Sequence, residues 1–177
     1  AEAPAGEAIV VARRGRAHAA PVKDALDALR PEQYVLKTVA SGGAKRLLVC
    51  GADDTGTLYA AYRLAERLGV RFYLHGDVVP DSRVPWTLPD LDETGKPLFA
   101  TRGGQPFHDF PEGPDWWDRD DYLSYFAQLP KMRMNFFGLH CYPEGGVGPE
   151  PLVWIGSQAD LEPSGAVRFA YPAQWAS

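Results

Sequence analysis

Residues 45–74 read KRLLVCGADDTGTLYAAYRLAERLGVRFYL and predict a strand, a helix and a second strand in succession. The run 45–51 predicts a strand, with the apolar residues LLVC at 47–50 after two charged ones. Asp53 or Asp54 follows it in a position to cap the helix, because a carboxylate accepts the free N–H groups of the first turn. Gly69 lies where a helix ends in a left-handed C-cap, and the run VRFYL then predicts the second strand.

Apolar residues recur in this helix at a spacing of three or four, which predicts one buried stripe. The stripe consists of Leu58, Ala61, Tyr62, Ala65 and Leu68. Upstream, β-branched runs predict strands at 7–12 and 34–41, with a helix over 21–30 between them. The order β-α-β-β-α-β therefore predicts a mixed sheet with helices packed on it.

The segment 51–56 has the G-x-x-x-x-G spacing of a phosphate loop and joins a strand to a helix. Thr57 stands where that motif needs lysine, and two aspartates would repel a phosphate. A nucleotide site is therefore not expected here. The basic turn at 13–16 is expected to be solvated rather than to bind phosphate.

Composition excludes several classes of protein. The 177 residues are 45% hydrophobic and carry a net charge of −5, which argues against disorder and against a nucleic-acid partner. No apolar run approaches the ~18 residues of a membrane span. Cys50 and Cys141 form no CxxC pair, which excludes zinc ribbons. The short stretch 1–6 is consistent either with the remnant of signal cleavage or merely with an arbitrary end of the chain; on the first interpretation a secreted or periplasmic location is expected.

The second half predicts the opening of a (β/α)₈ barrel. Strands are expected at 98–102 and 135–140, with a helix over 119–129 that Asp118 caps and Pro130 ends. The inner face of this helix is expected to carry Tyr122, Leu123, Phe126 and Leu129. Polar side chains follow both strands, and in such barrels these loops build the active site. A full barrel needs about 250 residues, so either the chain is a fragment, as we expect, or the barrel interpretation is wrong.

Three stretches resemble known carbohydrate-active enzymes. Residues 51–73 resemble the last helix of the non-catalytic domain that precedes the barrel in family 20 β-N-acetylhexosaminidases, and similar domains precede the barrels of α-glucuronidases. Residues 96–103, KPLFATRG, resemble the P-x-F-x-x-R-G opening of those barrels, and 131–140, KMRMNFFGLH, resemble their second strand. The resemblance implies a zincin-like α+β accessory domain over 1–88 and the N-terminal portion of a barrel over 98–177. The prolines at 80–97, with little periodicity between them, predict either a linker, assigned to 89–97, or a strand pair wrapped by loops. The sequence contains no HExxH, so no zinc or other cofactor is implied.

The resemblance also implies which side chains contact a sugar. Arg102 matches an arginine that binds hydroxyls of the terminal sugar, and His140 matches a histidine in the sugar pocket. From the residues alone, Arg102 could instead pair with a nearby carboxylate, and His140 could be a core histidine. Trp116 and Trp117 are expected to divide between stacking on a sugar and anchoring their loop. The candidate substrate-binding residues are Arg102, His108, Trp116, His140, Tyr142 and Glu144.

The predicted function is that of a glycoside hydrolase fragment, hexosaminidase-like or α-glucuronidase-like, acting on oligosaccharides or polysaccharides. Its catalytic carboxylates are expected beyond Ser177, so the chain alone should be inactive. Asp109 and Glu144 are carboxylates within the chain, but turn or cap roles suit them better. The alternative is a stand-alone carbohydrate-binding module that uses the loop around Trp116 and has no catalytic activity.

Overall fold

The computed structural model describes residues 6–41, 43–83, 87–106, 113–114, 117–138, 157–164, 166 and 168. The chain forms two compact units. The first consists of Ala1–Arg102 with Ala127–Asn135, and the second of Gly103–Phe126 with Phe136–Ser177. The first unit therefore includes a short segment, Ala127–Asn135, that follows part of the second unit in the sequence.

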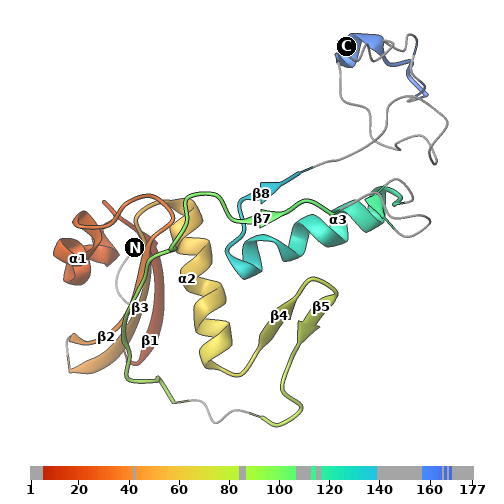
Figure 1. Cartoon of the computed structure of the whole chain (residues 1–177). Helices are drawn as coiled ribbons and strands as arrows, with labels where there is room; N and C mark the ends of the chain where they lie inside the picture. The colour runs from red at the N-terminus through yellow and green to blue at the C-terminus, as the bar shows by residue number, and fades with distance from the viewer. Residues whose placement is uncertain are drawn as a thin grey trace. The chain divides into compact units, whose positions relative to one another are not determined.

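A four-stranded mixed sheet forms the centre of the first unit (Figure 1). Its order is β1 (Ala8–Arg13), β3 (Ala44–Gly51), β2 (Tyr34–Ser41) and β6 (Asp92–Gly95). β1 is parallel to β3, whereas β2 is antiparallel to both β3 and β6. The predicted mixed sheet is confirmed.

β6 lies inside the segment 89–97, for which the sequence predicts a linker. Its residues, DETG, have no apolar alternation, but pairing with β2 needs only backbone hydrogen bonds. A short, charged strand at the edge of a sheet also discourages pairing with other chains. Gly95 has to lack a side chain, because a Cβ there would collide with the Tyr34 ring.

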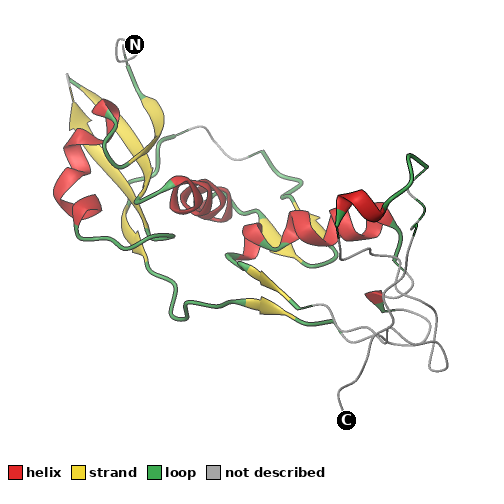
Figure 2. Ribbon diagram, turned by 90° about the horizontal axis from the view of Figure 1, so that it is seen from above, coloured by secondary structure: helices red, strands yellow, loops and turns green. Residues whose placement is uncertain are grey.

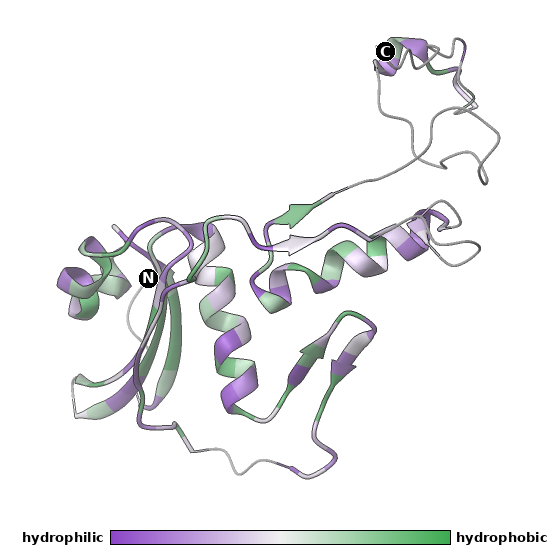
Figure 3. Cartoon of the chain, in the orientation of Figure 1, coloured by the Kyte–Doolittle hydropathy of each residue, from purple (hydrophilic) through white to green (hydrophobic). Residues whose placement is uncertain are grey.

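Helices cover both faces of the sheet (Figure 1). The 3₁₀ helix η1 (Ala17–Val22) and the short α1 (Lys23–Asp27) pack on one face, and α2 (Asp54–Arg67) packs on the other. Alternate residues of the strands contribute to two hydrophobic cores, one on each face of the sheet. Figure 3 shows the hydrophobic character of β1 and β3. One core comprises Ala12, Ala19, Val22, Leu26, Leu29, Val35, Leu48, Cys50 and Ala52. The other comprises Tyr34, Leu36, Leu47, Val49, Tyr59, Ala60, Leu64 and Leu88.

Helix α2 begins and ends as its sequence predicts, but the predicted stripe is borne out only in part: Ala61 and Leu68 are partly buried against the core, and the fully buried residues are others. Asp53 is the N-cap and accepts a hydrogen bond from the Gly56 N–H at 2.7 Å, and Gly69 has φ +101° after the last turn. The buried residues are Gly56, Tyr59, Ala60 and Leu64. The predicted stripe is wrong at Leu58, which is 42% exposed. The buried face is set by the close approach of α2 to Gln33, because a Cβ on Gly56 would collide with the Gln33 carbonyl oxygen.

The strand predicted after α2 forms, but outside the main sheet. β4 (Arg71–Tyr73) pairs antiparallel with β5 (Gly76–Val78) as a hairpin. Within the described part of the chain, no helix combines the length and apolar character that crossing a membrane requires.

The second unit contains a strand–helix–strand sequence with parallel strands (Figure 2). β7 (Gly103–Gly104) pairs in parallel with β8 (Phe136–Phe137), and α3 (Arg119–Gln128) lies between them in the chain. The helix cap is confirmed, because Asp118 Oδ1 accepts the N–H groups of Asp120 and Asp121 at 2.8 and 3.0 Å. The 3₁₀ helices η3 (Pro130–Met132) and η4 (Gln158–Asp160) follow later in the chain.

Two expectations for this region are corrected. No strand forms at 98–102, since β7 starts at Gly103, and the described part of the second strand is limited to β8. On α3, Tyr122 is buried as expected, but Leu123 and Phe126 are 50% and 42% exposed. A two-stranded sheet offers too little surface to cover a whole helix face.

Candidate functional site

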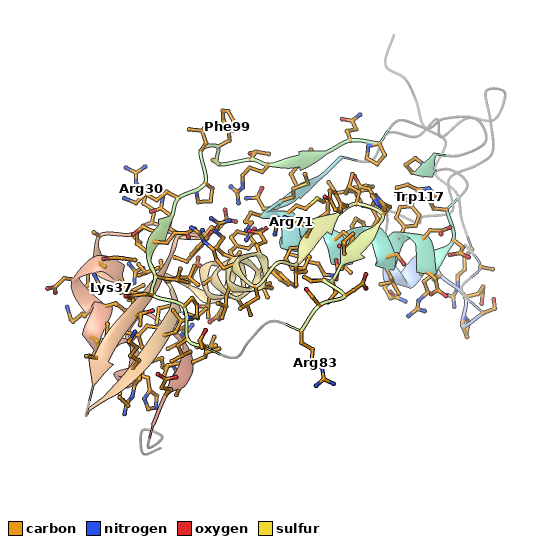
Figure 4. All side chains as sticks on the ribbon, turned by 90° about the horizontal axis from the view of Figure 1, so that it is seen from below. Arg30, Lys37, Arg71, Arg83, Phe99 and Trp117 are labelled. Atoms are coloured by element: carbon orange, nitrogen blue, oxygen red, sulfur yellow. The ribbon has the colours of Figure 1, made fainter. Side chains whose placement is uncertain are left out.

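The described residues include one of the six candidate substrate-binding residues, Arg102. The other five, together with Asp109, lie outside the described residues. These five are His108, Trp116, His140, Tyr142 and Glu144. Trp117 is described, and its ring packs against Tyr122 and Tyr125 with centroids 5.3 and 5.1 Å apart (Figure 4). Trp117 is therefore placed as an anchor of its loop.

Arg102 uses its guanidinium to bind other parts of the first unit. Nη2 lies 2.6 Å from Glu32 Oε2, which is the carboxylate pairing that the sequence left open. Nη1 donates to the carbonyls of Phe99 and Ala100 at 2.6 and 3.1 Å, and Nε donates to the Arg133 carbonyl at 2.6 Å. The side chain is 14% exposed. Most of its five N–H donors are thus already committed.

Glu32 is the centre of this arrangement. Its carboxylate also accepts hydrogen bonds from Asn135 Nδ2 at 3.0 and 3.2 Å, and its backbone N–H donates to both Asp53 oxygens at 3.1 and 3.2 Å. Burial would raise the pKa of Glu32, but the hydrogen bonds from Arg102 and Asn135 and the Arg102 charge outweigh it and lower the pKa below its ordinary value. Glu32 therefore stays ionised.

The backbone at Glu32 is left-handed, with φ +65°. A residue with a side chain adopts this conformation at a cost of order 1 kcal/mol or more, so its surroundings have to hold it there. The Asp53 carboxylate, which also caps α2, accepts the Glu32 N–H and so holds Glu32 in this conformation. Tyr59 supports the cluster from within the core, with its ring centroid 6.0 Å from Arg102 Cζ.

This cluster also explains why 98–102 is a loop. Asn135 Nδ2 donates to the Ala100 carbonyl at 2.9 Å, and Arg102 binds the Phe99 and Ala100 carbonyls. Side chains thus bind carbonyls that a strand would pair. The apolar side chains of Leu98 and Phe99 face solvent, 86% and 66% exposed.

A pocket of about 510 Å³, here called the Phe99 pocket, lies beside this loop within the first unit. It is lined by Arg30, Pro31, Glu32, Gln33, Pro97, Leu98, Phe99, Ala100, Arg102 and Asn135. Among these described lining residues, Glu32 is the one carboxylate. Glycoside hydrolysis uses two carboxyl groups about 5–9.5 Å apart, so the lining suits binding rather than hydrolysis.

Sequence reasoning missed Glu32 and gave Asn135 no role. Glu32 lies in the turn PEQ before β2, where no periodic pattern marks it. Its partners Arg102 and Asn135 lie 70 and 103 positions away. Asn135 does fall within the quoted 131–140 stretch, and that was the one available signal.

Comparison with models of protein families gives a match for the N-terminal part of the chain. Residues 1–64 match the model of the family described as Glycosyl hydrolase family 67 N-terminus. The matched region covers β1, η1, α1, β2, β3 and most of α2. No protein with a curated description matches the chain. The match covers about a third of the chain and makes that part similar to the N-terminal region of a glycoside hydrolase.

Proposed function

We propose that this chain is the N-terminal part of an α-glucuronidase-like glycoside hydrolase, which cleaves glycosidic bonds of oligosaccharides or polysaccharides. The observation that carries the proposal is the match of residues 1–64 to the N-terminus of family 67. That match favours the α-glucuronidase-like form over the hexosaminidase-like one. Secretion or export to the periplasm belongs to the same proposal.

The strand–helix–strand sequence of the second unit supports the barrel part of the proposal. Parallel strands joined by a helix are the repeating element of a (β/α)₈ barrel. Isolated two-stranded sheets are only marginally stable in water. Phe136 of β8 is 46% exposed, as expected for a strand that further strands or helices would cover in a barrel. We therefore propose a zincin-like accessory domain over 1–88 and the first barrel units over 98–177, joined by the segment 89–97, which contributes β6 to the sheet of the first unit.

The roles of the candidate residues follow from this architecture. The catalytic carboxylates are proposed to lie beyond Ser177, with His108, Trp116, His140, Tyr142 and Glu144 contacting the sugar. Arg102 differs, because it directly precedes β7, whereas barrel active sites form at the carboxyl ends of strands. Its hydrogen bonds favour holding the 97–102 loop over binding the terminal sugar.

The test is hydrolysis by the intact protein, with the 177-residue chain as the control. The substrates are oligosaccharides with a terminal α-linked glucuronic acid and 4-nitrophenyl N-acetyl-β-glucosaminide. Release of glucuronic acid by the intact protein, and none by the control, is expected. Release of N-acetylglucosamine alone would assign the hexosaminidase-like form. Binding of oligosaccharides with no hydrolysis of either would replace the proposal with the binding module.

A further inference from the structure

We propose that two copies of this chain associate through β1, which pairs antiparallel with the β1 of the second copy about a two-fold axis at Val10. The four strands of each copy then form one continuous sheet of eight strands. The association goes beyond the proposed hydrolysis and does not depend on it. It rests on the open edge that β1 presents, on the contrast with the opposite edge of the sheet, and on a sequence that is complementary to itself.

β1 has a row of backbone groups for which the described residues provide no strand. It lies at the end of the sheet and, among the described strands, pairs with β3 alone. In a parallel ladder, alternate residues direct their N–H and C=O groups to the neighbouring strand. The Arg14 N–H donates to the Gly51 carbonyl at 2.8 Å and continues this ladder, so the even-numbered residues of β1 face β3. The N–H and C=O groups of Ile9 and Val11 therefore point outward from the edge of the sheet.

The two edges of this sheet are built differently. β6, at one edge, is four residues long and reads DETG, a short and charged strand that discourages further pairing. β1, at the other edge, is six residues long and reads AIVVAR, with no proline and no charge before its last residue. A longer, β-branched and uncharged edge is a template for another strand. Of the two edges, β1 is therefore the one that can accept a partner.

The sequence around β1 is complementary to itself when it runs antiparallel. Residues 7–13 read EAIVVAR, which is symmetric about Val10 in side-chain type except at its ends, where the charges are opposite. Pairing about Val10 places alanine opposite alanine and Ile9 opposite Val11 of the second copy. It also places Glu7 of each copy opposite Arg13 of the other. Charge complementarity at both ends of the strand therefore favours a second copy of this chain as the partner.

The direction of the backbone groups agrees with this register. Antiparallel residues alternate between hydrogen-bonded and non-hydrogen-bonded pairs. Ile9 and Val11, whose backbone groups point outward, fall opposite each other and form hydrogen-bonded pairs. Val10, whose backbone groups face β3, falls on the axis in a non-hydrogen-bonded pair. Moving the axis to Ile9 or Val11 would still pair backbone groups but would place an apolar residue opposite Glu7 or Arg13, so the charges select Val10.

The side chains on the face that carries α2 also fit the pairing. Residues opposite each other in an antiparallel pair share a face. Ile9 is partly buried against the core beneath α2, and Val11, on the same face, is 58% exposed. In the dimer, Val11 packs on Ile9 of the second copy. Arg13 already pairs with Asp54 at 3.2 Å, and its five N–H donors allow a second carboxylate, that of Glu7, to bind as well.

The first test is sedimentation equilibrium of the 177-residue chain from about 5 µM to about 200 µM. The mass should rise with concentration from 19.4 kDa toward twice that value. Val11→Pro should weaken the dimer at least about tenfold, because one outward N–H is lost from each copy. The fold should persist, since proline is tolerated where its nitrogen faces away from the sheet, and circular dichroism checks this. The intact protein should show the same dimer and the same loss.

The second test reads the register through charge reversal. Glu7→Arg and Arg13→Glu each place like charges opposite one another, so each variant alone should remain monomeric over that range. Mixed in equal amounts, the two variants restore opposite charges at both ends and should form a heterodimer. Asp81→Arg is the matched control, because it makes the same change of charge at an exposed residue outside β1 and should dimerise as the parent chain does.

The proposal is overturned if the chain or the intact protein remains monomeric, since the edge would then be solvated or covered by another segment of the same chain. A dimer that persists in Val11→Pro would place the interface elsewhere and would also overturn it. Failure of the two charge variants to pair when mixed would refute the register at Val10. Because hydrolysis is measured separately, an inactive protein that dimerises through β1 would contradict the proposed function alone.

Discussion

Replacing Asp53 with alanine should destabilise the first unit far more than the loss of one surface carboxylate would. Asp53 Oδ1 accepts the Gly56 N–H at 2.7 Å and so caps α2. Both of its oxygens accept the Glu32 N–H, which holds Glu32 in its left-handed backbone. One side chain therefore supports both a helix start and the centre of the polar cluster.

The magnitude follows from these two contacts. Loss of an N-cap costs about 1 kcal/mol, and leaving a partly buried N–H without a partner costs about 1–2 kcal/mol more. Asp53→Ala should therefore lower the free energy of unfolding by about 2–3 kcal/mol. Asp53→Asn keeps an acceptor oxygen for the cap and should cost less than about 1 kcal/mol.

Urea denaturation followed by circular dichroism at 222 nm measures both changes. The two variants should have the same dependence on urea concentration and different midpoints. Equal losses in Asp53→Ala and Asp53→Asn would refute the reasoning, because the effect would then not come from hydrogen-bond acceptance. A loss below about 1 kcal/mol in Asp53→Ala would refute it too, since even the cap would be missing.

Three other outcomes are expected. Burial would raise the pKa of Glu32 and of Glu93, but hydrogen bonds, chiefly from arginines, outweigh it and lower both pKa values. The stabilisation from these two carboxylates is therefore present above their ordinary pKa of 4.5 and is lost as the pH falls through the lower pKa of the folded state. Urea denaturation from pH 6 to pH 3 should show this loss of stability, and a Glu32→Gln, Glu93→Gln double variant should make stability less dependent on pH. Gly51→Ala should cost at least about 2 kcal/mol in the same assay, because its Cβ would collide with the backbone of the first turn of α2, and a neutral result would contradict that packing. Burial raises the pKa of Cys50 to about 11, so in a Cys141→Ser background its thiol should resist iodoacetamide at pH 8 until urea unfolds the chain; rapid labelling would contradict its burial.

Local sequence patterns predicted the elements of the first unit well, whereas contacts between residues far apart in the sequence could not be predicted from them. The carboxylate before α2 and the glycine after it gave both ends of that helix, because capping is a contact between near neighbours. The face that α2 buries was predicted only in part, since it also depends on how closely Gly56 lets the helix approach Gln33.

The loop at 98–102 was mistaken for a strand for a similar reason. Leu98 and Phe99 give it the composition of a strand, but partners supplied by Glu32 and Asn135, far away in the sequence, hold it as a loop. The Phe99 pocket could not be predicted for the same reason. Resemblance to known enzymes drew attention to Arg102, although it did not indicate that Glu32 is its partner.

The discontinuous make-up of the first unit bears on how the protein is synthesised. Segment 127–135 provides Arg133, which pairs with Glu66 of α2 at 2.5 Å, and Lys131, which pairs with Asp77 at 2.6 Å. A ribosome that has released only residues up to Arg102 therefore exposes a sheet and helices that still lack these partners. Because both cores consist of residues that precede Arg102, the sheet and its helices can pack at that stage, and Arg133 and Lys131 add their ion pairs only after that segment has emerged.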